Sequence, residues 1–120
     1  MSWTIYMEPE AQKDYQKLAG SRRQLVLKAI KRVGINPISI YEGGYGKPLG
    51  KQHGMDLTGC YKIKLRDAGI RVIYRLVRTK TKMSVVVIGM RADDAVYREA
   101  WNRIQKHPLS EAEEPEETGD

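Results

Sequence analysis

Positively charged side chains alternate with apolar ones where the chain is expected to form a strand. Residues 61–66 read Tyr-Lys-Ile-Lys-Leu-Arg, so a strand would turn Lys62, Lys64 and Arg66 to one face and the apolar side chains to the other. A short turn leads into a second strand-like run, and a tight hairpin would bring Arg71 of that run close to the two lysines. We therefore expect a cluster of cations on one face of a β-sheet.

Two further arginines would extend this cluster. Arg75 shares a strand face with Arg71, and Arg91 follows Gly89 at the exit of an apolar run over residues 85–88. That run is apolar on both faces, which is typical of a central strand. Arg91 is therefore expected to join the cluster from the end of a neighbouring strand.

Crowded cations of this kind fit a phosphate, because an arriving anion relieves their mutual repulsion. Cleavage of RNA by its own 2′-hydroxyl needs a base for that hydroxyl, positive charge around the phosphorane and an acid for the departing 5′-oxygen. Repulsion favours the neutral form of Lys62 or Lys64, which suits them to proton exchange. Arg71 keeps its charge and is better suited to hold the phosphate.

The same residue types have plainer interpretations that the sequence leaves open. Alternating Lys and Arg on an exposed strand face often only solvate it and protect the sheet from edge pairing. Tyr97, Trp101 and Ile104 have the spacing of a helix face that packs into a core. His53 and His107 give no metal-ligand signature, and neither a metal nor another cofactor is expected.

The elements that must position these residues follow an α+β pattern. In chain order we expect a strand over residues 3–7, a helix from Pro9 to Gly20, a helix from Ser21 to Gly34, a loop over 36–59, strands over 61–66, 70–78 and 83–90, and a helix from Asp93 or Asp94. The two early helices follow each other directly, which predicts a helical hairpin. Short turns between the last three strands predict an antiparallel meander.

The charges are divided between a basic body and an acidic tail. All 21 Lys and Arg residues precede His107, together with nine of the 15 acidic residues, so residues 1–106 carry a charge of +12. A body of this charge is expected to bind a polyanion. The other six acidic residues lie in residues 107–120, which lack apolar periodicity and are expected to be disordered. Such a tail either solubilises the chain or folds back on the basic face and weakens non-specific RNA binding.

The length and composition predict one domain over residues 1–106 with one modest core. The single cysteine, Cys60, excludes an internal disulfide and is expected to pack as a small hydrophobic residue. No stretch approaches the roughly 20 apolar residues of a membrane span. We therefore expect a cytoplasmic protein without a membrane partner.

Four motifs in the body carry a resemblance to a known family. They read Cys-Tyr-Lys-Ile-Lys-Leu-Arg over residues 60–66, Gly-Ile-Arg-Val-Ile-Tyr over 69–74, Gly-Met-Arg over 89–91 and Val-Tyr over 96–97. In this order and at this spacing they strongly resemble the RelE family of toxins, over residues 1–106. The resemblance implies a RelE-like, microbial RNase-like fold, with an antiparallel four-stranded sheet, an N-terminal helical hairpin and a C-terminal helix.

The resemblance also implies a function. Members of this family are toxins of type II toxin–antitoxin pairs, and they are metal-independent endoribonucleases that cut the mRNA codon in the ribosomal A site. The expected partners are the ribosome, mRNA and a cognate antitoxin, whose acidic segment would match the basic body. Two alternatives stay open: a DNA gyrase inhibitor, as in the related ParE branch, and a non-catalytic nucleic-acid-binding module.

Carried over position by position, the resemblance assigns roles to five residues. The two strand lysines of the family correspond to Lys62 and Lys64, and the phosphate-contacting arginine corresponds to Arg71. Arg91 matches an arginine proposed as general acid, and its role here is either that acid or a stabiliser of the leaving oxygen. Tyr97 matches a helix tyrosine that contacts the mRNA, which conflicts with its core-like spacing.

One departure from the family lies just before the first lysine strand. Relatives often carry an additional basic residue there, where this chain has Met55 and Asp56. Lys51 or His53 is the candidate substitute. The expected RNA contacts outside the catalytic set are therefore Arg66, Arg75, Lys51 and His53.

Overall fold

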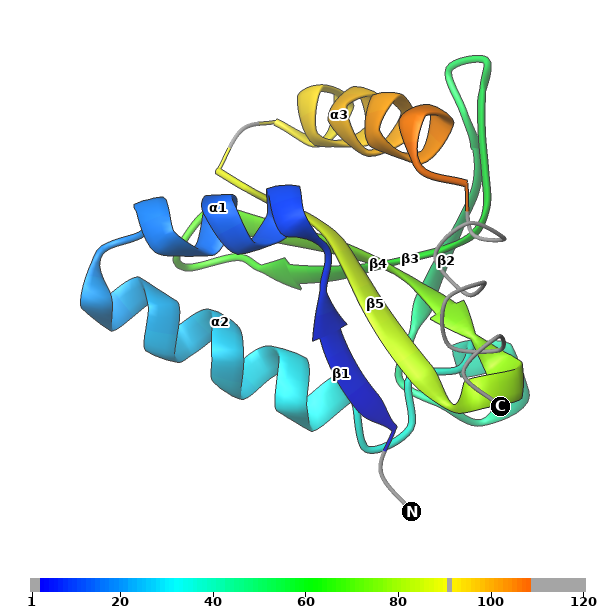
Figure 1. Cartoon of the computed structure of the whole chain (residues 1–120), viewed down its shortest axis with the longest axis horizontal. Coiled ribbons are helices and arrows are strands. Elements are labelled where there is room, and N and C mark those ends of the chain that lie inside the picture. The colour runs from blue at the N-terminus through cyan, green and yellow to red at the C-terminus, as the bar shows by residue number, and fades with distance from the viewer. Residues whose placement is uncertain (1–2, 91, 109–120) are drawn as a thin grey trace.

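The computed structural model describes residues 3–90 and 92–108, and Figure 1 shows the course of the chain. The elements in order are β1 (Thr4–Met7), α1 (Pro9–Lys17), α2 (Gly20–Val33), the short 3-10 helix η1 (Ile40–Glu42), β2 (Lys47–Gln52), β3 (Met55–Leu65), β4 (Ile70–Val77), the 3-10 helix η2 (Arg78–Lys80), β5 (Lys82–Gly89) and α3 (Asp93–Lys106). Arg91 and most of the acidic tail, residues 109–120, lie outside the described residues. The prediction of a disordered tail therefore stays a prediction.

Within residues 3–90 and 92–108 the strands form one five-stranded sheet in the order β1-β5-β4-β3-β2. The strand β1 runs parallel to β5, and every other neighbouring pair is antiparallel. The α+β class, the N-terminal helical hairpin and the C-terminal helix are confirmed (Figure 1), and so is the inner position of the apolar strand β5. The expected antiparallel four-stranded sheet differs in detail, because a fifth strand is present and the first strand is parallel.

The fifth strand arises from a segment that the sequence predicted to be a loop. Strands β2 and β3 form a hairpin whose two-residue turn is His53 and Gly54, both with positive φ. Gly50 and Gly59 also have positive φ, and the register of the pair shifts beside Gly50. These irregularities interrupt the alternation of apolar and polar residues, so the usual signature of a strand is missing.

The boundary between the first two helices also differs from expectation. Helix α1 ends at Lys17, and Gly20 begins α2 instead of ending α1. Ser21 therefore lies inside α2. The residue at the N-cap is Ala19, and no side-chain hydrogen bond caps the helix. These two differences in helix boundaries do not involve β3 and β4, which carry the cationic cluster.

Each face of the sheet carries its own hydrophobic core. One core packs α1 and α2 against side chains such as Ile63, Val72 and Tyr74. The other packs α3 and the β2–β3 hairpin against side chains such as Ile73 and Val86. The predicted alternation along β4 is therefore confirmed, and α3 lies on the sheet face opposite the helical hairpin.

Cys60 lies in the core beneath α3, where only 3% of its surface is exposed. Burial raises the pKa of the Cys60 thiol to about 12. The thiol therefore stays protonated and packs as a small hydrophobic group, as predicted. Within the described part of the chain, no helix has the length and apolar character that a bilayer crossing demands.

Candidate active site

The predicted cationic face is present on strands β3 and β4. Lys62 and Lys64 point away from the core that contains Tyr61 and Ile63. Lys64 stands directly opposite Arg71 in the antiparallel register, so their side chains leave the sheet on the same face. The structure thus brings Lys64 and Arg71 together, as the short turn between the two strands predicted.

A carboxylate, that of Asp93, occupies the middle of this face. Asp93 is the first residue of α3, and its Oδ1 accepts a hydrogen bond from Arg71 Nε. Its Oδ2 lies 3.8 Å from Lys64 Nζ. The hydrogen bond from Arg71, together with the nearby charges of Lys62 and Lys64, lowers the pKa of Asp93 below its usual value. The carboxylate is therefore an anion at neutral pH.

The sequence pattern predicted only that the last helix begins at Asp93 or Asp94, and α3 does begin at Asp93. Ala92 is the residue at the cap, without a side-chain hydrogen bond. Negative charge in the first turn of a helix is favourable in itself, so the residue type does not reveal a second role. Only the docking of α3 on the sheet shows that this carboxylate meets Arg71.

Tyr97 lies one turn further along α3 and combines the two interpretations that the sequence left in conflict. Its residue surface is only 5% exposed, and its ring packs in the core beneath α3. Its hydroxyl accepts a hydrogen bond from Lys62 Nζ at 3.0 Å, and the same Nζ lies 5.7 Å from the ring centre. The ring therefore belongs to the core while the hydroxyl fixes Lys62.

Lys47 is a cation of the site that sequence reasoning missed. It stands directly opposite Lys62 in the pairing of β2 with β3 and is exposed. Residues opposite each other in such a pair share a face of the sheet, so Lys47 extends the cationic face beyond Lys62. The only signal was a lysine at the end of a glycine-rich segment, and its position depends on a strand that the pattern did not predict.

The two residues proposed to replace a missing family cation lie on the bent hairpin. Lys51 is exposed and pairs across the hairpin with Asp56. His53, in the turn, contacts Asp94 of α3 with 3.1 Å between Nε2 and Oδ1. The hairpin turn thus reaches the start of α3, whereas Lys51 is not in contact with the central lysines. Arg66 is exposed just beyond the end of β3.

Arg75 is not available for RNA, which corrects its prediction as an RNA contact. Only 4% of its surface is exposed, and its guanidinium forms a salt bridge with Glu8, with 2.9 Å between Nε and Oε2. Its Nη2 donates to the carbonyl of His107 at the end of α3. Alternation along β4 correctly predicted the face of Arg75, but it could not predict that α3 covers this part of the face.

Arg91 lies outside the described residues, so its role stays a prediction. The chain on either side of it is described. It leaves β5 at Gly89, which stands opposite Arg71, and returns at Asp93, which contacts Arg71. Both ends of the short connection that contains Arg91 are therefore anchored beside the cationic face.

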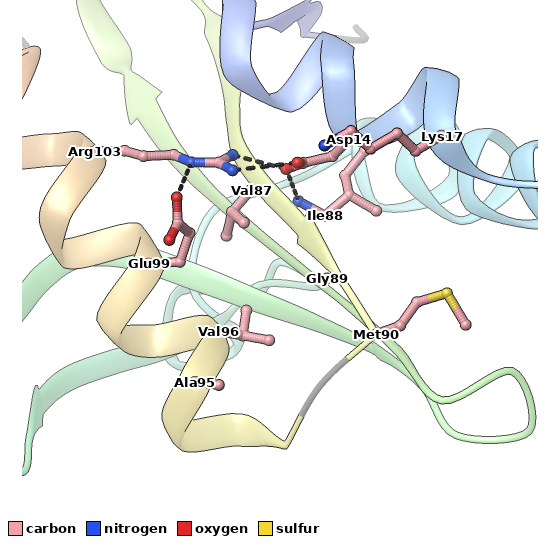
Figure 2. Close-up of a pocket in the computed structure, with 10 residues that line it drawn as sticks. All are labelled: Asp14, Lys17, Val87, Ile88, Gly89, Met90, Ala95, Val96, Glu99 and Arg103. Carbon is pink, nitrogen blue, oxygen red and sulfur yellow. Dashed lines mark hydrogen bonds and ion pairs between the residues drawn. The ribbon is translucent and has the colours of Figure 1, made fainter.

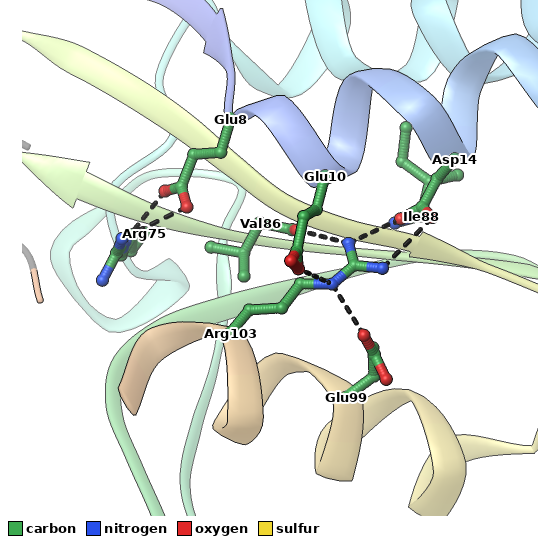
Figure 3. A network of polar contacts seen from close by, with 8 residues as sticks. All are labelled: Glu8, Glu10, Asp14, Arg75, Val86, Ile88, Glu99 and Arg103. Carbon is green, nitrogen blue, oxygen red and sulfur yellow. Dashed lines mark hydrogen bonds and ion pairs between the residues drawn. The ribbon is translucent and has the colours of Figure 1, made fainter. Parts of the chain in front are cut away.

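A polar network holds α3 in the position that the site requires. Arg103 of α3 donates to the carboxylate of Asp14 on α1 at 2.7 Å and to the carbonyl of Val86 on β5 at 2.9 Å. Asp14 also accepts the backbone N–H of Ile88 at 3.0 Å. Figure 3 shows these contacts, together with Glu10 and Glu99 around the same guanidinium. The network links α1, β5 and α3, so it fixes the helix that carries Asp93 and Tyr97.

A cavity of about 300 Å³ lies beside this network. Figure 2 shows residues of α1, the end of β5 and α3 around it, with the Arg103 and Asp14 pair on one side and Met90 on the other. The site residues Lys62, Lys64, Arg71 and Tyr97 do not line it. The cationic face is therefore separate from this cavity.

Comparison with known proteins gives a consistent result, although no family model matches the chain. The mRNA interferase toxin RelE of Escherichia coli K12 is 31% identical over 104 residues, which cover 87% of this chain and 99% of that protein. The mRNA interferase RelE of Shigella flexneri has the same identity and coverage. These shares mean that the similarity extends over nearly the whole basic body.

Solved structures agree with the sequence comparison. A mutant of E. coli toxin RelE in the free state superimposes with a TM-score of 0.65 at 30% identity, covering 87% of this chain and 99% of that one. The toxin in the intact E. coli RelBE toxin–antitoxin complex gives a TM-score of 0.59 at 26% identity, covering 76% and 99%. With relatives matched at this identity over almost their full length, the chain belongs to the RelE toxin family.

Proposed function

We propose that this chain is the toxin of a type II toxin–antitoxin pair and an endoribonuclease that cleaves mRNA in the ribosomal A site. The observation that carries the proposal is the convergence of Lys62, Lys64 and Arg71 on one sheet face, with the Tyr97 hydroxyl bonded to Lys62. The relatives named as mRNA interferases support the substrate class. Ribosomes lie in the cytoplasm, so we place the activity there.

The proposed reaction is attack of the 2′-hydroxyl on the adjacent phosphate, which leaves a 2′,3′-cyclic phosphate and a 5′-hydroxyl. Arg71 holds the phosphate, because its planar guanidinium keeps its charge and matches two phosphate oxygens. Lys62 and Lys64 exchange the proton of the nucleophile and stabilise the phosphorane. Arg91 serves the leaving 5′-oxygen, as its acid or as its stabiliser. Because these side chains supply the charge that the reaction requires, we assign it no metal.

We also propose that a cognate antitoxin silences the chain by binding the basic body. Solved relatives include toxin–antitoxin complexes such as the E. coli RelBE complex. The charge of +12 over residues 1–106 favours a partner with an acidic segment. Such a segment would neutralise the same cations that contact RNA.

The proposal is tested on mRNA bound to ribosomes with a defined codon in the A site. Primer extension is expected to reveal one cut in that codon, and end analysis a 2′,3′-cyclic phosphate on the upstream fragment. A matched mRNA with a single 2′-deoxynucleotide at the cut should stay intact, because the nucleophile is absent. A gyrase supercoiling assay runs in parallel. Inhibited supercoiling without mRNA cleavage would favour the ParE-like alternative, and RNA binding without either effect would leave a binding module.

The hydroxyl of Tyr97 is predicted to matter for activity and not for the fold. Tyr97→Phe keeps the buried ring but releases Lys62 from its hydrogen bond, so cleavage should fall about tenfold while thermal unfolding changes little. Tyr97→Ala is a poorer test, because loss of a buried ring costs about 3 kcal/mol of stability.

A double-mutant cycle shows whether the hydroxyl acts through Lys62. The Lys62→Ala, Tyr97→Phe double variant should be no slower than Lys62→Ala alone, because Lys62 is the partner of the hydroxyl among the residues that the structure describes. Tyr45→Phe, at an exposed loop tyrosine, serves as the control. Additive losses in the double variant would assign the hydroxyl a role of its own on the RNA.

A further inference from the structure

The cationic face already holds an anion, and that anion is part of the protein. The Asp93 carboxylate accepts a hydrogen bond from Arg71 Nε with one oxygen and approaches Lys64 with the other. Those are two of the cations that the proposed reaction assigns to the phosphate. Arg71 also donates from Nη1 to the carbonyl of Gly69 at 3.3 Å, so its guanidinium is held in place while it contacts Asp93.

The contact is accessible to a ligand. The side chains of Asp93, Lys64 and Arg71 are 34%, 28% and 19% exposed. Asp93 begins α3, and among the described residues its carboxylate contacts Arg71 and Lys64. Rotation of the side chain can therefore release both cations without moving the helix.

A carboxylate and a phosphate compete for the same hydrogen-bond donors. Both are oxyanions, and a guanidinium binds each of them through its N–H groups. Arg71 Nε cannot donate to both at full strength. We propose that Asp93 is a specificity-determining residue: it competes with the RNA phosphate for Arg71 and Lys64, and only RNA held by additional contacts displaces it. This inference rests on the proposed function and explains how such a basic protein would discriminate against free RNA.

The chemistry of Asp93 favours competition over proton transfer. Its pKa is lowered, above all by the hydrogen bond from Arg71. A carboxylate with a lowered pKa is a weak base at neutral pH, so it is poorly suited to take the proton of a 2′-hydroxyl. The positive end of the α3 dipole stabilises the same charged form.

The neighbouring Asp94 provides a matched control. It is also in the first turn of α3, but it is 69% exposed and contacts His53 instead of the sheet cations. Asp93→Asn and Asp94→Asn each remove one negative charge from the same helix end. A difference between them therefore reports the local contact and not the change in net charge.

The experiment measures binding of a fluorescent oligonucleotide that carries a 2′-deoxynucleotide at the cut and cannot react. Asp93→Asn is expected to lower its dissociation constant about tenfold or more, because the lost contact is a charge-assisted hydrogen bond. Asp94→Asn should lower it no more than about threefold, because Asp94 does not contact Lys64 or Arg71 and the effect of its exposed charge is screened at moderate salt. In an Arg71→Ala background, Asp93→Asn should bring no such gain.

Equal dissociation constants for the two asparagine variants would overturn the inference, and so would weaker binding by Asp93→Asn, which would make Asp93 a positioning residue for Arg71. Thermal unfolding confirms that each variant folds, and Asp93→Ser repeats the test with a shorter side chain. Cleavage of free RNA, with ribosome-bound mRNA alongside, is scored separately, and we expect Asp93→Asn to accelerate the free-RNA reaction more. If no variant cuts any RNA while Asp93→Asn still binds more tightly, the nuclease proposal fails and the competition stands.

Discussion

Replacing Lys64 and Arg71 together with alanine is expected to lower the rate of cleavage of ribosome-bound mRNA by about 1000-fold or more. The two side chains stand opposite each other and share Asp93, so their removal takes the central charge from the face that would hold the phosphate. Single-turnover primer extension with saturating toxin measures the chemical step.

The control for this variant removes the same charge elsewhere. Lys28 and Lys31 are exposed on α2, on the sheet face opposite α3. Their double alanine variant should keep cleavage within about threefold of the parent, because at physiological salt distant surface charges are screened. Cleavage that survives in the Lys64 and Arg71 variant would show that the reaction takes place at another site.

The largest loss of stability is expected from Glu8→Ala. Glu8 is 7% exposed and accepts two hydrogen bonds from Arg75, which is 4% exposed, and one from Ser84 Oγ at 2.7 Å. Removing the carboxylate leaves the guanidinium buried and unpaired, which costs about 3 to 5 kcal/mol. Urea denaturation followed by circular dichroism measures the free energy of unfolding.

An exposed ion pair provides the comparison for Glu8. Arg78 Nη2 lies 2.8 Å from Glu42 Oε1, and about half of each side chain is exposed. Glu42→Ala should therefore change the free energy of unfolding little. A second variant removes the unpaired charge. Arg75→Leu in the Glu8→Ala background should recover part of the lost free energy of unfolding, because no unpaired charge is then buried. Equal effects of Glu8→Ala and Glu42→Ala would mean that Arg75 reaches water without its partner.

The central part of the site was predictable because short turns fix the register of neighbouring strands. Period-two alternation separated Lys62 and Lys64 from the core side chains, and the short turn before Ile70 placed Arg71 opposite Lys64. Two neighbouring strands and one turn were sufficient. The same local rule accounts for the correct alternation along β4 and the inner position of β5.

The rest of the site depends on packing between distant segments. Strand β2 escaped prediction because its bulge and its glycines interrupt the alternation, and its turn uses His53 where asparagine or aspartate usually signals a hairpin. The position of Lys47 could not be predicted either, because Lys47 lies in β2. The contacts of Asp93 and the burial of Arg75 follow from how α3 packs on the sheet. The residue pattern of one helix does not predict the angle at which the helix crosses the sheet.

The two cores also divide what mutation can change. Side chains between the sheet and the α1–α2 pair form the core on the sheet face opposite the cationic side chains, so substitutions there are expected to change stability more than activity. The layer under α3 contains Tyr97 and lies beneath the helix that carries Asp93, so replacements there are expected to change the position of that helix relative to the lysines. Relatives that differ in nucleotide preference are therefore expected to differ in the core under α3. Relatives adapted to different growth temperatures are expected to differ in the core under α1 and α2.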